Sequence, residues 1–189
     1  MNTVITVSCA LSEIDRAEVL RYAFAKEGSA ETEKILNECL SELPDLTFKV
    51  CYSEIPTNEI KTDSTSLRKR LEGCESAIIF AATVGIGIDR LISRYSKLSP
   101  VKALMFQAIG AERIEALCNS FEEKLKRDGL ILYPRFSPGY GDLDLNFQKY
   151  IFALLDCQKH IGLTLGESLV MSPSKSVTGV IGVRSRSDA

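Results

Sequence analysis

The sequence predicts an α+β fold, with a mixed, mostly antiparallel central sheet flanked by helices. Strand-like and helix-like segments both occur along the 189 residues, but they do not alternate strictly, as they would in a doubly wound parallel sheet. Residues 77–83 are apolar up to Thr83 and lie between Gly73 and Gly85, which is typical of a central strand buried on both faces. The glycines after this strand do not form a dinucleotide-binding turn, because Arg90 stands where G-x-G-x-x-G requires its third glycine.

In the first half of the chain, residues 3–8 alternate apolar and polar side chains and predict a strand. Residues 15–25 predict a helix with Leu20 and Phe24 on one face. Ser29 is a suitable N-cap for a second helix, which Pro44 follows.

Alternation over residues 47–52 then indicates a half-buried strand. The polar stretch 54–66, which contains Pro56, predicts a surface loop and is where we most expect disorder.

The second half contains a stripe of apolar residues over 88–95, which indicates a helix. Ser99-Pro100 begins a long helix that Gly129 ends. On its solvent face, Glu122 is expected to pair with Lys126 and Glu123 with Arg127.

The C-terminal third begins with a strand at 130–133, and a helix should start at Asp142 or Asp144. Residues 169–171 and 177–183 read as two closing strands, adjacent and antiparallel across a turn near Pro173.

Composition is that of an ordinary globular protein, with 45% hydrophobic and 25% charged residues. We expect one domain over 1–189, with a frayed tail at 184–189. A net charge of −2 argues against a nucleic-acid partner. Residues 1–11 lack the basic start of a signal peptide, and the longest apolar run, 77–88, is too short to cross a membrane. A cytoplasmic location is therefore expected.

The six cysteines include no C-x-x-C pair, and histidine occurs once. This composition favours reduced core thiols and no metal site. Nothing in the sequence resembles an activated nucleophile, so no catalytic residue is assigned.

The segment Arg135-Phe136-Ser137-Pro138-Gly139-Tyr140 carries the most functional information. A guanidinium binds a carboxylate through two parallel charged hydrogen bonds. A Pro-Gly corner lets backbone approach a ligand closely. Arg135 could equally be a structural residue that bonds loop carbonyls. Glu115 could bind an ammonium or a ribose hydroxyl, or be one more carboxylate on a solvated helix face.

Two weaker motifs have ordinary explanations. Residues 83–87 follow a strand and precede a helix, where phosphate can bind, but a tight strand-to-helix turn is the better interpretation. His160 at a helix end is best explained as a cap or surface residue. It is not assigned as a cobalt ligand, since Gln158 replaces the aspartate of Asp-x-His-x-x-Gly.

Taken together, the C-terminal motifs resemble the reactivation domain of cobalamin-dependent methionine synthase, in a short stand-alone form. The resemblance covers about residues 18–182. It depends mainly on three blocks, at 135–140, 161–168 and 171–179, with weaker similarity at 80–83, 89–91 and 115–117. The family fold is a C-shaped α+β domain around a mostly antiparallel sheet, unlike Rossmann-like methyltransferases.

The resemblance implies an S-adenosylmethionine site. Arg135 would hold the methionine carboxylate, Tyr140 would lie close to the transferable methyl, and Glu115 would contact the cofactor. Backbone groups of the loop would bind the rest of the cofactor, namely those of Phe136, Ser137, Gly139 and Tyr140. The family's N-terminal aspartate has no match here, and Gly141-Asp142-Leu143-Asp144 replaces its Pro-Ala-Cys-Pro-like continuation.

The resemblance also implies a role, which is reductive remethylation of cob(II)alamin with an electron from a flavodoxin-like or ferredoxin-like donor. Modules for homocysteine, folate and cobalamin are missing, so we expect the chain to act on a separate methionine synthase or other corrinoid methyltransferase that presents the cobalamin. Two alternatives remain open: a non-catalytic module that senses S-adenosylmethionine or docks on a corrinoid protein, and an unrelated enzyme that uses residues 83–87.

Overall fold

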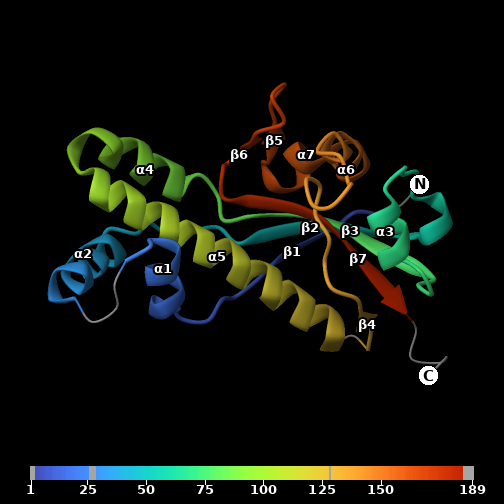
Figure 1. Cartoon of the computed structure of the whole chain (residues 1–189), viewed down its shortest axis with the longest axis horizontal. Helices are drawn as coiled ribbons and strands as arrows, with labels where there is room; N and C mark the ends of the chain where they lie inside the picture. Colours follow the sequence, from blue (N-terminus) through green and yellow to red (C-terminus); the bar gives the residue numbers. More distant parts are fainter. Residues whose placement is uncertain (1–2, 26–28, 128, 185–189) are drawn as a thin grey trace.

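The structure is a computed structural model that describes residues 3–25, 29–127 and 129–184. Its central sheet has five strands in the order β1-β2-β3-β7-β4, and every neighbouring pair is antiparallel. The expected α+β class and antiparallel sheet are therefore confirmed (Figure 1). The strands are β1 (Ile5–Ser8), β2 (Lys49–Pro56), β3 (Ser76–Thr83), β4 (Ile131–Leu132) and β7 (Ser176–Arg184). A separate two-stranded sheet pairs β5 (Thr164–Leu165) with β6 (Met171–Ser172).

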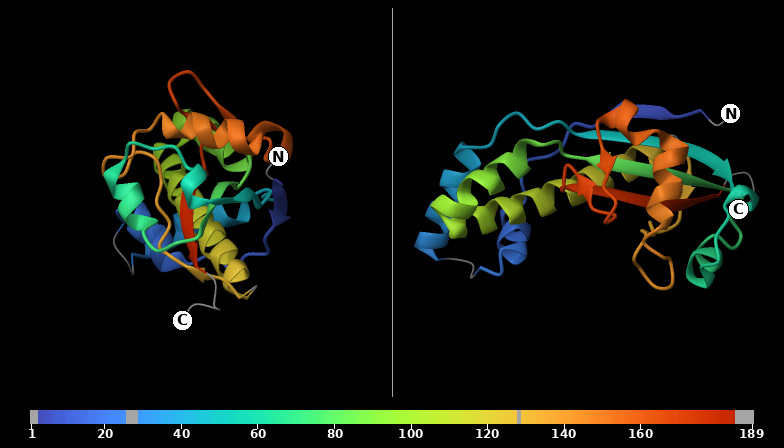
Figure 2. Two further views of the ribbon diagram at one scale, coloured as in Figure 1. Left: turned by 90° about the vertical axis from the view of Figure 1, so that its right-hand side faces the viewer. Right: turned by 90° about the horizontal axis from the view of Figure 1, so that it is seen from above.

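Helices cover both faces of the central sheet (Figure 2). On one face lies α5 (Pro100–Arg127), and α1 (Arg16–Tyr22), α2 (Ala30–Ser41) and α4 (Gly87–Leu98) pack on this helix. The other face packs against α3 (Thr65–Arg70), α6 (Phe147–Leu155) and α7 (Cys157–Ile161). A short 3-10 turn, η1 (Thr57–Glu59), follows β2.

The long helix α5 organises the first of these faces and crosses the sheet diagonally (Figure 1). It begins at Pro100 as expected, and Gly129 follows its end with a φ of 90°. Leu117 and Phe121 are buried against the sheet. Since α5 contacts both β3 and the edge strand β4, side chains on its flank can reach residues that follow β4.

The strand predicted at 47–52 is longer and more buried than expected. It runs from Lys49 to Pro56, and both Val50 and Cys51 are fully buried although they point to opposite faces. The alternation expected of a half-buried strand is absent because the helices α3, α6 and α7 cover the second face.

The loop predicted at 54–66 is also a misassignment. Residues 54–56 continue β2 and pair with β3, and Ser64 caps the missed helix α3 by accepting the N–H of Leu67 at 3.0 Å. The polar composition of residues 54–66 concealed this structure, because the segment has only two aliphatic residues, Ile55 and Ile60, and both are buried.

Two further expectations fail. The strands near Pro173 do not pair with each other, because β3 and β4 occupy both edges of β7 and β6 pairs with β5 instead. Phe24 lies beyond the end of α1, has a φ of 52° and is 95% exposed, so it does not share the buried face of Leu20.

At the C-terminus, Arg184 belongs to β7 and lies opposite Ile131, so it is not part of a tail. The rest of the predicted tail, 185–189, lies outside the described residues. Within the described ranges, no helix combines the length and the apolar character needed to cross a membrane.

Candidate functional site

The segment Arg135–Tyr140 leaves β4 and runs along β7. Phe136 and Val180 exchange two backbone hydrogen bonds, each of 2.8 Å. Gly179, beside Val180, lies close to the buried ring of Phe80 and to the backbone of Phe136. A Cβ at this position would stand 2.7 Å from Cε1 of Phe80 and 3.4 Å from the carbonyl oxygen of Phe136. The missing side chain therefore leaves room for the ring of Phe80 beneath the strand that pairs with the loop.

A tight turn then bends the loop away from the sheet. The N–H of Tyr140 donates to the carbonyl of Ser137 at 3.2 Å, and Gly139 adopts a φ of 92°. Proline at the second position and glycine at the third are what a type II turn requires. The turn leaves Tyr140 68% exposed, at the end of the loop.

Asp142 anchors the far side of this turn to α3. Its carboxylate accepts hydrogen bonds from the Ser64 hydroxyl at 2.5 Å and from the N–H groups of Thr65 and Ser66 at 2.9 and 3.0 Å. These bonds, led by the one from Ser64, hold the pKa of Asp142 far below its ordinary value. Asp142 therefore does not begin α6, as one alternative proposed, and Asn146 precedes that helix instead.

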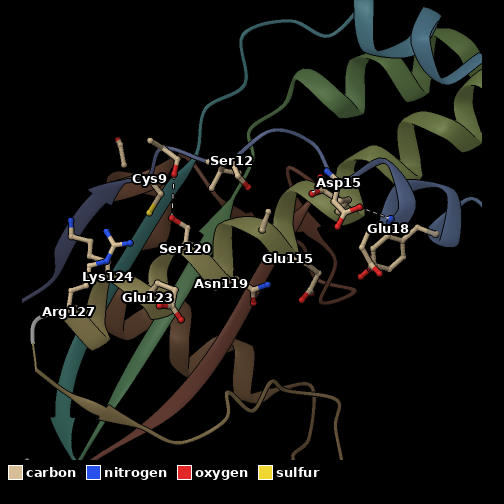
Figure 3. A pocket seen from close by; sticks show the side chains of 16 residues that line it. Cys9, Ser12, Asp15, Glu18, Glu115, Asn119, Ser120, Glu123, Lys124 and Arg127 are labelled. Carbon is tan, nitrogen blue, oxygen red and sulfur yellow. Dashed lines mark hydrogen bonds between the residues drawn. The ribbon is translucent and has the colours of Figure 1, made fainter. Parts of the chain in front are cut away.

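Arg135 lies against one flank of α5. Its Nη2 donates to Oε2 of Glu115 at 2.5 Å, and its Nη1 donates to Oε1 of Glu122 at 2.6 Å and to Oδ1 of Asn119 at 3.1 Å. Positions 115, 119 and 122 are one and two helical turns apart, so they share a face of the helix. Figure 3 shows Glu115 and Asn119 projecting from the same side of α5.

This arrangement corrects the pairing predicted for α5. Glu122 bonds to Arg135 rather than to Lys126, and Lys126 pairs with Glu123 at 2.8 Å. The error arose because spacing within a helix identifies only partners on the same helix, whereas Arg135, from a loop outside α5, offers Glu122 a more buried partner.

The guanidinium of Arg135 is largely, but not fully, engaged. Its three hydrogen bonds use three of its five N–H groups, so Nε–H and one Nη2–H remain for another acceptor. The side chain of Arg135 is 24% exposed, that of Glu122 20% and that of Glu115 43%. Of the two carboxylates, Glu115 is thus the one that solvent, or a ligand, reaches more easily.

A hollow of about 480 Å³ opens beside this cluster. Helices, strands and the loop all contribute to its wall, which includes Arg70, Glu115, Arg135, Phe136, Ser137, Pro138, Tyr140, Gln148, Met171, Ser176, Val177 and Thr178. The guanidinium of Arg70 lies 5.1 Å above the ring of Phe136. The structure therefore brings five of the six residues predicted for the site, all except Gly139, to the wall of one hollow.

Gln148 is a residue of this wall that the sequence analysis missed. It is 6% exposed, and among the described residues its Oε1 atom has no hydrogen-bond partner. A glutamine in the first turn of an amphipathic helix carries no signal in the sequence, so only its burial and its position in the wall distinguish it.

A second hollow, of about 800 Å³, lies on the other side of Glu115, between residues 8–15 and α5 (Figure 3). Several of its charged groups already have structural partners. Asp15 caps α1 by accepting the N–H of Glu18, Glu18 pairs with Arg21, and Glu123 pairs with Lys126. The smaller hollow has the better combination of partly free donors and unpartnered acceptors.

The two weaker motifs have structural roles. Gly85 has a φ of 79°, and its N–H donates to the side chain of Thr83 at 3.2 Å, as in a tight strand-to-helix turn. His160 forms a 2.9 Å hydrogen bond through Nδ1 with the hydroxyl of Thr6. Neither residue borders the smaller hollow.

Comparison with known proteins identifies a matching family and a matching fold. The family model described as "Vitamin B12 dependent methionine synthase, activation domain" matches residues 67–188, which is more than half of the chain. Among solved structures, the crystal structure of the MetH reactivation domain bound to AdoHcy matches with a TM-score of 0.62 and 18% sequence identity, over 99% of this chain and 79% of that chain. No curated protein matches the sequence.

The structural likeness is at the level of the fold, and the family model covers all three motif blocks of the C-terminal region. The chain therefore belongs to the family of activation domains of vitamin B12-dependent methionine synthase.

Proposed function

We propose that the chain binds S-adenosylmethionine in the 480 Å³ hollow and supports the reductive remethylation of cob(II)alamin on a separate protein. The observation that carries this proposal is the shared wall formed by Arg135, Glu115 and the loop that ends at Tyr140. The related MetH domain was crystallised with AdoHcy, the product that remains when S-adenosylmethionine has lost its methyl group.

The residues of the hollow suit the two charges of an amino acid. The carboxylate of the ligand would take the free N–H groups of Arg135 and displace Glu115, and Glu115 would then accept the ligand ammonium. Glu122 would stay on Arg135 and hold it in place. The backbone of Phe136, Ser137, Gly139 and Tyr140 would bind the remainder of the ligand.

The chemistry of methyl transfer belongs to the ligand, and the protein supplies position. The sulfonium provides the methyl group and leaves as a neutral thioether, while a flavodoxin-like or ferredoxin-like donor provides one electron. Cobalamin would be presented by a methionine synthase or another corrinoid methyltransferase. Tyr140, exposed at the end of the loop, would lie near the transferred methyl. The proposed partners, a reduced electron donor and a corrinoid methyltransferase, fit a cytoplasmic location for the chain.

A reconstituted reaction tests this proposal. The mixture contains a corrinoid protein loaded with cob(II)alamin, a chemical or flavodoxin reductant and S-adenosylmethionine, and the visible spectrum reports methylcobalamin. We expect methylcobalamin only when the chain is present, and much less with Arg135→Ala. Equal yields with and without the chain would contradict a role in methyl transfer.

A non-catalytic module is the second candidate, and the pairing of Arg135 favours it. A guanidinium already bonded to two carboxylates gives up part of its binding energy when a ligand displaces one of them. Binding of S-adenosylmethionine without formation of methylcobalamin in the reconstituted reaction would select this alternative.

A further inference from the structure

The buried amide of Gln148 distinguishes one end of the hollow from the other. Gln148 comes from the first turn of α6, and Arg70 comes from the last turn of α3, so both belong to the layer of helices opposite α5. Glu115, by contrast, belongs to α5, and the loop segment 135–140 lies between the two layers. The charged pair Arg135–Glu115 and the amide of Gln148 therefore occupy different walls of the same hollow.

Without a ligand, the unpaired amide oxygen of Gln148 lowers the stability of the folded protein. Its Oε1 is shielded from solvent and has no hydrogen-bond partner within the described part of the chain. Burying a polar group in this way costs about 1–3 kcal/mol, and native proteins rarely leave such groups unpaired. A ligand that supplies a donor at this point would recover that free energy.

We propose that Gln148 recognises the adenine of the bound nucleoside, with Oε1 accepting a hydrogen bond from the 6-amino group. This inference depends on the proposed function, because Arg135 and Glu115 must take the amino-acid end for the base to reach the other wall. A carboxamide offers an acceptor and a donor side by side, which matches the amino group and an adjacent ring nitrogen of adenine.

The ligand pair that tests this inference differs only at position 6 of the base. S-adenosylhomocysteine is compared, by calorimetric titration, with the analogue that carries hydrogen in place of the 6-amino group. We expect the unsubstituted protein to bind S-adenosylhomocysteine at least about 5-fold more tightly, since the analogue leaves Oε1 unpaired. Equal affinity for the two ligands would overturn the inference but not the proposed function. Absence of binding by either ligand to the folded protein would overturn both.

The variant Gln148→Met separates recognition from a structural role. Methionine has a similar volume and no polar amide, so the thermal midpoint of the free protein should be unchanged or higher. The preference for the 6-amino ligand should disappear. A preference that survives in Gln148→Met would contradict the role of Gln148. This includes an equal loss of affinity for both ligands, which would mean that Gln148 contacts a part of the ligand other than the 6-amino group.

A matched control is Gln158→Met, on the exposed side of α7 and away from the hollow. It should leave both the affinities and the preference between the two ligands unchanged. A change as large as that in Gln148→Met would show that the effect is not local, and would count against the inference.

Discussion

Glu115 accepts a hydrogen bond from Arg135 at 2.5 Å, so the guanidinium proposed to bind the ligand carboxylate already carries a carboxylate of its own chain. With Glu122 on the other nitrogen, the cluster has one positive and two negative charges. A ligand with a carboxylate alone would add a third negative charge. A zwitterion adds none in total and also offers Glu115 an ammonium, so the cluster should select α-amino acids.

The first prediction concerns Glu115→Gln. In the unsubstituted protein, S-adenosylhomocysteine should bind about 10-fold more tightly than the analogue that lacks the α-ammonium, because one charged hydrogen bond is lost. In Glu115→Gln this ratio should fall towards one, since the competing carboxylate and the partner of the ammonium are both removed. Competition titrations with the two ligands measure the ratio. A ratio that stays at 10 in the variant would mean that Glu115 does not bind the ammonium.

Glu122 is predicted to position Arg135 rather than touch the ligand. Glu122→Gln should weaken binding of S-adenosylhomocysteine about 5- to 10-fold, since the guanidinium loses its more buried ionic partner. It should leave the binding of 5′-methylthioadenosine unchanged, because that ligand has no amino-acid group.

Glu123→Gln is the control for Glu122, because Glu123 is the next residue of α5 but pairs with Lys126 instead of Arg135. Equal weakening of both ligands in Glu122→Gln would indicate a general disturbance of the hollow.

The lowered pKa of Asp142 leads us to predict that the stability of the protein depends on pH. Its folded-state pKa lies well below that of an unfolded aspartate, so its contribution is fully present above about pH 4 and is lost as the pH falls further. Thermal unfolding at pH values between about 2 and 6 should therefore show a steeper acid loss for the unsubstituted protein than for Asp142→Asn.

The control for Asp142 is Asp63→Asn, at an exposed carboxylate that makes none of the hydrogen bonds to α3. This variant should follow the unsubstituted curve. Identical slopes for the unsubstituted protein and Asp142→Asn would show that the three hydrogen bonds of Asp142 do not contribute to stability.

Gly179→Ala should disturb both the core and the loop. Its methyl group would stand 2.7 Å from the ring of Phe80, which is fully buried and has no free space to enter. We expect a loss of about 1–3 kcal/mol in the free energy of unfolding, measured by denaturant titration, together with weaker ligand binding as Phe136 is displaced.

For comparison, Gly166→Ala in the β5–β6 hairpin would bring its methyl group only to 3.4 Å from the nearest atom, the carbonyl oxygen of Val170. It should cost little stability. A similar cost for both alanine variants would contradict the close approach at Gly179.

The sequence allowed the strongly patterned elements to be predicted, and tertiary contacts decided the rest. The apolar run 77–83 and the proline start of α5 were identifiable because burial and capping leave local signals. The helix α3 was not, because part of its N-terminal cap comes from Asp142, more than 70 residues away. The pairing of β6 with β5 also depended on which strands already occupied the edges of β7.

At the candidate site, the motif 135–140 and Glu115 could be named from the sequence, and all of these residues except Gly139 line one hollow. The hydrogen bonds of Arg135 to Asn119 and Glu122 could not be predicted, since both residues look like ordinary members of a solvated helix face. Gln148 was equally inconspicuous, because an unpaired buried amide is a property of packing alone.

The central claim, that Arg135 binds the carboxylate of S-adenosylmethionine, is tested most directly by calorimetric titration of this ligand into the unsubstituted protein and into Arg135→Ala. We predict saturable one-to-one binding that weakens by about 2–4 kcal/mol in the variant, since a charged, partly buried partner is lost. No heat at millimolar ligand with folded protein, or the same affinity in Arg135→Ala, would contradict the claim and make Arg135 a purely structural partner of α5.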